Sequence, residues 1–340
     1  MNACAALEKL TMPFTSVLDT VAALGKGVPN SLKEVHLLGG TMGKHAFASC
    51  DKLERIVLSD SIKKIPDHAF AGCIKLQNVD CSSGITDIGE YAFNNCHELS
   101  SIELTPALAT IGKDAFANSA LTGDLTLTGV REIGAWAFSA TQIRSITHGD
   151  KLKTLKASTF EKCEALATVV VTSATKSIEH SAFSGCKELS EISLEYVTTI
   201  GDKAFFECEH LKNVSLASIE TLGVSAFEEC KALETVMFND ALEVISERAF
   251  AGCKALYKIN IPGQLTEIGN RAFASTAMKK LELRMPYSLV TVGEYIFESA
   301  YSPVVYVTPN QASKWNSNWG SNCKGHGLFN LNKKVITKKP

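Results

Sequence analysis

The sequence predicts a solenoid, an α/β-type or mainly-β repeat with a parallel sheet on one face and short helical or 3-10 turns behind it. Three observations lead to this fold class: a phenylalanine that recurs with a nearly fixed period, an alternating strand-like segment after it, and an aliphatic residue five positions before it. Self-similarity at about 20 to 50 residues is typical of units that bury their apolar faces against their neighbours.

The recurring phenylalanine appears at steps of 22 to 24 residues, so twelve of the sixteen phenylalanines are candidates for one core column. These twelve are Phe47, Phe70, Phe93, Phe116, Phe138, Phe160, Phe183, Phe205, Phe227, Phe250, Phe273 and Phe297. Units stacked in this way would place their strands side by side, at about 4.8 Å, in a parallel sheet.

The strand of each unit is predicted from alternation. In residues 53–58, Ile56 and Leu58 occupy inward positions, whereas Arg55 and Val57 occupy outward positions. This period of two is that of a short strand with one buried face.

The remainder of the unit is predicted to turn twice. An aliphatic residue such as Ile65 faces inward again, and glycine follows it in several units, as at Gly89 and Gly112. Such a glycine indicates a corner that needs either a positive φ or a close approach of two backbones. Residues 67–73, which contain the phenylalanine, are expected to form a helical or 3-10 turn.

Cysteine holds the position three residues after the phenylalanine in eight units, where other units have Ser, Thr or Ala. A position that accepts these residue types favours a small buried side chain, as free cysteine usually is. No C-x2-C spacing occurs, and the units without cysteine argue against a ladder of disulfides, so we expect no metal site and no cofactor. The eight are Cys50, Cys73, Cys96, Cys163, Cys186, Cys208, Cys230 and Cys253.

The ends of the chain depart from the repeat. Residues 1–308 are expected to form the array, of which 1–31 are a partial or degenerate N-terminal repeat, and residues 309–340 a C-terminal cap. Met1 takes the place of a repeat phenylalanine, so an export signal is expected upstream of this segment.

Composition excludes several classes of partner. The net charge of -2 gives no electrostatic attraction to nucleic acid or to an anionic membrane. No apolar run approaches the roughly 20 residues of a membrane helix. We therefore expect no nucleic-acid partner and no membrane insertion of this segment.

The unit reads Leu-x-x-Ile-x-Leu and then Ile-x-x-Ile-Gly-x-x-Ala-Phe-x-x-Cys, and in this form it resembles the BspA-like (Treponema pallidum-type) leucine-rich repeat. The resemblance covers residues 1–308, although the fixed asparagine of ordinary leucine-rich repeats is missing. It implies a right-handed leucine-rich-repeat solenoid, displayed on a cell surface or secreted, that adheres to host or matrix proteins or to other microbes. It implies no catalytic residues.

The outward strand residues form two columns that are small, polar, mixed in sign and free of aromatic side chains. Because sugar platforms and single-strand nucleic-acid channels rely on aromatic stacking, a protein partner is favoured over carbohydrate. A solvated face without a ligand is the alternative. The candidate protein-binding residues are Arg55, Val57, Asn78, Asp80, Glu103, Thr126, Glu191, Asn213, Met237 and Lys258.

The histidines do not indicate catalysis. His45 and His68 hold a variable turn position, and His148 is expected at an outward strand position. No Cys, Asp or Ser recurs beside them at a spacing that indicates a triad or a metal site. We therefore expect a non-enzymatic cell-surface or secreted interaction module that adheres to or recognises a protein. The alternative is a structural stalk or spacer that presents another domain of a longer protein.

Overall fold

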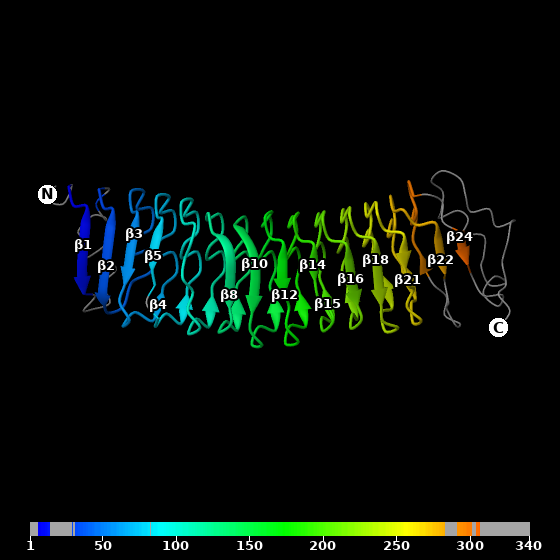
Figure 1. The fold of residues 1–340 in the computed structure, drawn as a ribbon, viewed down its shortest axis with the longest axis horizontal. Helices are drawn as coiled ribbons and strands as arrows, with labels where there is room; N and C mark the ends of the chain where they lie inside the picture. The colour runs from blue at the N-terminus through cyan, green and yellow to red at the C-terminus, as the bar shows by residue number, and fades with distance from the viewer. Residues whose placement is uncertain are drawn as a thin grey trace. The chain divides into compact units, whose positions relative to one another are not determined.

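The computed structural model describes residues 6–13, 29, 31–81, 83–282, 291–300 and 304–306. The chain divides into two compact units, unit 1 (Met1–Leu166) and unit 2 (Ala167–Pro340), which are described one at a time. Within each unit short strands repeat from coil to coil, and the described residues contain no helix (Figure 1).

Unit 1 has two rows of strands. One row, which we call the open sheet, contains β1 (Lys9–Pro13), β2 (Glu34–Gly39), β3 (Arg55–Leu58), β5 (Asn78–Asp80), β8 (Thr122–Leu127) and β10 (Gln142–His148). The other, the short-strand row, contains β4 (Lys64–Ile65), β6 (Asp87–Ile88), β7 (Thr110–Ile111), β9 (Glu132–Ile133) and β11 (Thr154–Leu155). Pairing within the rows is parallel, from β1 to β5, between β8 and β10, and from β4 to β9.

Unit 2 repeats this arrangement. Its open sheet contains β12 (Thr168–Val170), β14 (Glu191–Ile192), β16 (Asn213–Leu216), β18 (Thr235–Phe238), β20 (Lys258–Ile259), β22 (Lys280–Glu282) and β24 (Val304–Tyr306). Its short-strand row contains β13 (Ser177–Ile178), β15 (Thr199–Ile200), β17 (Thr221–Leu222), β19 (Val244–Ile245), β21 (Glu267–Ile268) and β23 (Thr291–Val292). The recorded pairings are again parallel.

The predicted fold class is therefore confirmed: a solenoid of stacked coils with a parallel sheet. Inward and outward residues of the strands alternate as expected: in β3, Ile56 and Leu58 are buried and Arg55 is exposed. One coil differs, because residues 101–105 form no strand and the open sheet is interrupted between β5 and β8.

The phenylalanines form a stacked column in each unit. Ring centroids of successive coils lie 5.3 to 5.6 Å apart from Phe47 to Phe160 and 5.0 to 5.9 Å apart from Phe183 to Phe297. Neighbouring planes differ by at most 19°. Because a coil step of about 4.8 Å is shorter than these distances, the rings are offset, which is a favoured stacking geometry.

The turns that carry the phenylalanines are not the helical or 3-10 turns that we expected. The residues two before and two after the phenylalanine adopt left-handed φ values, as Tyr91 (55°) and Asn95 (59°) do around Phe93. A helix requires right-handed φ throughout, so the alternation of hand prevents it. The left-handed positions are filled by His, Tyr, Trp, Asp, Lys and Arg as well as by Asn and Gly.

Hydrogen bonds between coils stabilise these turns. The N–H groups of Tyr91, Phe93 and Asn95 donate to carbonyls of the next coil, at 2.8, 2.7 and 2.9 Å. Non-glycine residues at left-handed φ cost roughly 1 to 2 kcal/mol each. The same three bonds recur in other coils, and they offset this cost by satisfying buried backbone groups.

The glycines after the inward aliphatic residue serve close approach, and positive φ is not the reason for them. A Cβ at Gly89 would lie 2.5 Å from the Asp67 nitrogen, and one at Gly201 would lie 2.7 Å from the His180 nitrogen. Neither glycine has a positive φ. The expectation of a positive φ is therefore wrong for these two glycines, and the expectation of a close approach of two backbones holds.

We predict that Phe205→Ala lowers the free energy of unfolding by about 3 to 5 kcal/mol, because a fully buried ring is lost between two stacked neighbours. The matched control is Phe206→Ala, at the next residue, whose side chain is half-buried. Its loss should be less than half as large. Chemical denaturation of the variants measures both, and equal losses would contradict the stacked core.

Gly201→Ala should destabilise unit 2 by about 1 to 3 kcal/mol, because the added methyl group collides with backbone of the preceding coil. Gly263→Ala is the control, since its Cβ would make ordinary contact at 3.4 Å with Asp240. That variant should be neutral or up to about 1 kcal/mol more stable, because alanine restricts the unfolded chain. Thermal unfolding of both variants tests the difference.

Candidate interaction surface

The structure places the ten candidate residues on the outward side of the open sheet or at its interruption. Nine of them are exposed and Val57 is half-buried. Each unit carries its own part of the surface. In unit 1 these are Arg55, Val57, Asn78, Asp80, Glu103 and Thr126; in unit 2 they are Glu191, Asn213, Met237 and Lys258. Glu103 lies in the coil without a strand, so its expected strand position is wrong although its exposure is as expected.

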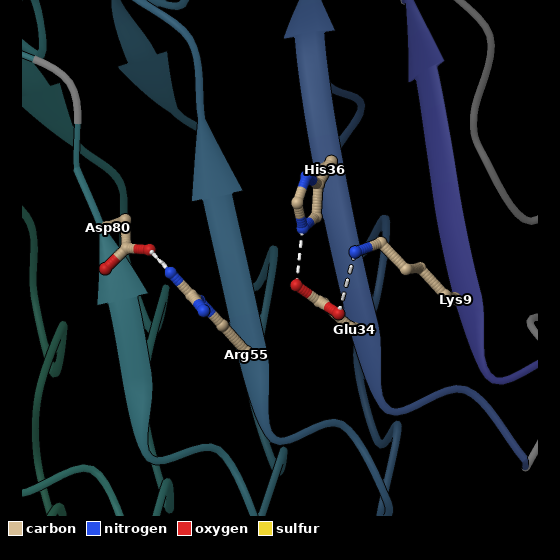
Figure 2. Close-up of polar contacts among 5 residues, drawn as sticks. All are labelled: Lys9, Glu34, His36, Arg55 and Asp80. Carbon is tan, nitrogen blue, oxygen red and sulfur yellow. Dashed lines mark hydrogen bonds and ion pairs between the residues drawn. The ribbon is translucent and has the colours of Figure 1, made fainter.

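The charges at the start of unit 1 are paired along the open sheet. The Arg55 guanidinium donates through Nε (3.1 Å) and Nη2 (2.6 Å) to Oδ2 of Asp80 on the next strand (Figure 2). Glu34 receives Lys9 Nζ at 3.1 Å and His36 Nε2 at 2.5 Å (Figure 2). These contacts hold the pKa of the Glu34 carboxyl below its ordinary value, and the hydrogen bond from His36 has a larger effect than that from Lys9.

These pairs contribute little to folding. The side chains of Arg55 and Asp80 are 52% and 49% exposed, and exposed ion pairs are worth about 0 to 1 kcal/mol. Their effect is to arrange charge, because opposite signs alternate from strand to strand along β1, β2, β3 and β5.

Further along, the surface consists of small polar side chains. Ser145 donates to Asp124 (2.7 Å) between β10 and β8, and Thr235 donates to Asn213 (2.6 Å) between β18 and β16. Met237 is an exposed apolar side chain there, at 47%. The described residues contain no group of three or more His, Cys, Asp or Glu that could hold a metal ion. Such a surface can form hydrogen bonds and ion pairs with a partner of matching shape.

A feature that the sequence reading missed lies on the turns of unit 1. His45 stacks on His68 (centroids 4.4 Å apart) and His68 on Tyr91 (4.7 Å), and the Lys113 ammonium lies 5.7 Å from the Tyr91 ring and 5.2 Å from that of Trp136. These positions were read as merely variable, one at a time. The sequence could have shown this strip of rings if the same repeat position had been compared in successive coils. Residues at the same position of neighbouring coils lie next to each other in the stack.

The repeat of this chain matches a known family. The family described as BspA type leucine-rich repeat region (6 copies) matches residues 40–167, 122–234, 176–304 and 220–336. The chain belongs to this family. The resemblance stated from the repeat unit is thereby confirmed.

Several solved structures share the fold of this chain at low identity. A leucine-rich repeat protein from Bacteroides ovatus is 22% identical, with 88% of this chain and 81% of that chain covered and a TM-score of 0.63. One from Eubacterium ventriosum is also 22% identical, with 89% and 91% covered and a TM-score of 0.53. The pneumococcal vaccine antigen PcpA is 17% identical, with 100% and 91% covered and a TM-score of 0.56. At these identities the likeness concerns the fold, and the search of curated proteins found no match.

The cysteine column of the BspA-type repeat is chosen for more than size. Cys73 Sγ donates to the Phe47 carbonyl of the preceding coil at 3.1 Å, and Cys96 Sγ donates to that of Phe70 at 3.3 Å. Equivalent bonds occur in unit 2, for example from Cys230. Thr141 and Thr276 donate instead to the Phe138 and Phe273 carbonyls of their own coils, and Ser119 Oγ is buried without a partner. The bond to the preceding coil is therefore made by the cysteines, whereas the position as a whole requires a small side chain.

Burial makes these thiols poor nucleophiles. It raises the pKa of Cys96 to about 12 and that of Cys163 to about 11. Since the thiolate is the reactive form, Cys96 and Cys163 are poor nucleophiles at neutral pH.

His148 does not lie where we expected it. It occupies an inward position at the end of β10 and is 3% exposed. The loop before β10 is one residue shorter than in most coils, so each residue of β10 stands one repeat position later than a regular coil would place it. Because neighbouring residues of a strand face opposite sides, this shift turns His148 to the buried face. The predicted N-terminal repeat (1–31) lies largely outside the described residues, and the predicted cap (309–340) lies wholly outside them.

An aromatic disulfide reagent at pH 8 should label Cys96 and Cys163 in the folded protein about 100-fold more slowly than an exposed cysteine. The reason is the raised pKa together with burial. Ser215→Cys, at an exposed place on β16, provides the reference. Peptide mapping by mass spectrometry gives each rate, and equal labelling of Cys163 and the introduced cysteine would contradict the buried column.

Proposed function

We propose that this chain is a non-enzymatic interaction module that binds a protein partner through its open sheet. One observation carries the proposal: in each unit the candidate residues are exposed apart from Val57, and all except Glu103 lie on strands that pair in parallel. The strands hold these side chains at fixed spacing on buried aliphatic residues, so the surface is preorganised for binding.

The chemistry of the surface favours protein over other partners. Its outward columns alternate in charge around Arg55 and Asp80 and contain no Phe, Tyr or Trp ring on which a sugar or base could stack, and the His36 ring is bonded to Glu34. The aromatic side chains of unit 1 lie on the turns, and the faces of His45, His68 and Tyr91 are stacked on one another. Carbohydrate is therefore the less favoured ligand.

The proposed location is a cell surface or the extracellular medium, and the proposed partner is a host, matrix or microbial surface protein. Support comes from membership of the BspA-type family together with the surface role that its resemblance implies. Among the described residues there is no helix of the length and hydrophobicity that a membrane crossing requires.

A stalk or spacer is the second candidate. The observation that favours it is the pairing of Lys9 with Glu34 and of Arg55 with Asp80, because charges satisfied within the chain need no partner. The repeat would then serve to hold another domain at a distance.

The test compares charge reversals. A variant with Arg55→Glu, Glu103→Lys and Glu191→Lys should bind extracellular-matrix or bacterial surface protein about tenfold or more weakly than the parent, because central charges that meet a partner are costly to reverse. Lys151→Glu with Glu220→Lys, at exposed positions outside the candidate surface, is the control.

Biolayer interferometry on immobilised candidates gives the affinities, and thermal unfolding confirms that each variant folds. Unchanged binding by the triple variant would remove the open sheet from the proposal. If an unrelated repeat array of equal length replaces this one without loss of function in the intact protein, the spacer is the correct description.

A further inference from the structure

His148 interrupts an apolar column. The equivalent inward position at the end of the strand segment is apolar in other coils. It is buried at Leu37, Leu58, Leu127, Leu194, Leu216 and Phe238 and half-buried at Cys81, Leu104, Val171 and Ile261. His148 pairs in register with Leu127 of β8 and is 3% exposed. An ionisable ring therefore stands where the repeat buries hydrocarbon.

The hydrogen bonds of the ring define its protonation state. Nδ1 lies 3.0 Å from the Gly149 carbonyl, and because a carbonyl only accepts, Nδ1 carries the hydrogen. Nε2 is buried without a hydrogen-bond partner. The neutral ring therefore fits the site, whereas a second proton would sit on Nε2 with no acceptor.

Few charges surround this ring in unit 1. β8 presents the apolar Leu127, and the charged group that acts on the ring is Asp150, on the turn after β10. Burial lowers the pKa of His148 and outweighs both the Gly149 bond and the attraction of Asp150, which raise it.

We propose that His148 is an acid-sensitive switch in the open sheet of unit 1. When the pH falls below about 6.5, the pKa of a ring in water, protonation favours conformations in which β10 has left the sheet and Nε2 reaches water. β10 also carries Ser145 and Thr147 on its outward side, so the surface changes when the inward ring is charged. This inference does not depend on the proposed function.

The sign follows from proton binding. The folded ring holds fewer protons than a ring in water, whose pKa is about 6.5, so acid favours the open form. The ratio of open to closed β10 should rise up to about tenfold for each pH unit below that value, until the folded ring itself titrates.

Amide hydrogen exchange followed by mass spectrometry tests this, at pH 7.5 and pH 5.0, after correction for intrinsic exchange rates. In the parent protein the peptide containing residues 142–148 should lose up to about 30-fold of its protection between these pH values. His148→Leu restores the residue type of the column and should remove this loss. His97→Leu, at an exposed position of the same unit, should leave it unchanged.

If His148→Leu does not fold, His148→Gln supplies a neutral polar side chain for the same comparison. The histidine ring signals of the parent protein, followed by NMR, give an independent reading. Equal loss of protection in the parent and in the neutral variant would overturn the proposal, as would titration of the His148 ring at or above pH 6.5.

Discussion

The structure depends on the stacking of one buried phenylalanine on the next. Centroid distances of 5.3 to 5.6 Å in unit 1 and 5.0 to 5.9 Å in unit 2 allow offset contact between the rings while the strands keep their sheet spacing. A coil that lacked the ring would leave a cavity and also lose the anchor of the turn around it. Phenylalanine fills this position, fully buried, in eleven coils from Phe47 to Phe273.

The stack has a consequence for every other position. Because successive coils differ by one step of about 4.8 Å, equal positions of the repeat become spatial neighbours. The cysteine thiols donate to the phenylalanine carbonyls in this way, and the glycines meet the backbone of the preceding coil. On the surface the same rule produces the ion pair of Arg55 with Asp80 and the stack of His45 on His68. The charge pairing and ring stacking of a surface column therefore depend on neighbouring coils together.

This rule separates two kinds of surface in unit 1. The open sheet carries small and charged side chains that bond across strands, whereas the turns carry aromatic rings with Lys113 between Tyr91 and Trp136. The first leaves polar groups exposed, whereas in the second the rings stack on one another. His148, the last residue of β10, points to the buried side of the first surface.

The sequence by itself determined the period, the phenylalanine column, the inward residues of strands such as β3 and the exposure of most candidate residues. These follow from local patterns of hydrophobicity that any coil of this length must bury. Only the tertiary structure decided the left-handed turns around residues such as Phe93, the missing strand at Glu103, the aromatic strip and the burial of His148. Each of these depends on hydrogen bonds or packing between coils, or on where a shortened loop sets the register, and a pattern within one unit does not contain that information.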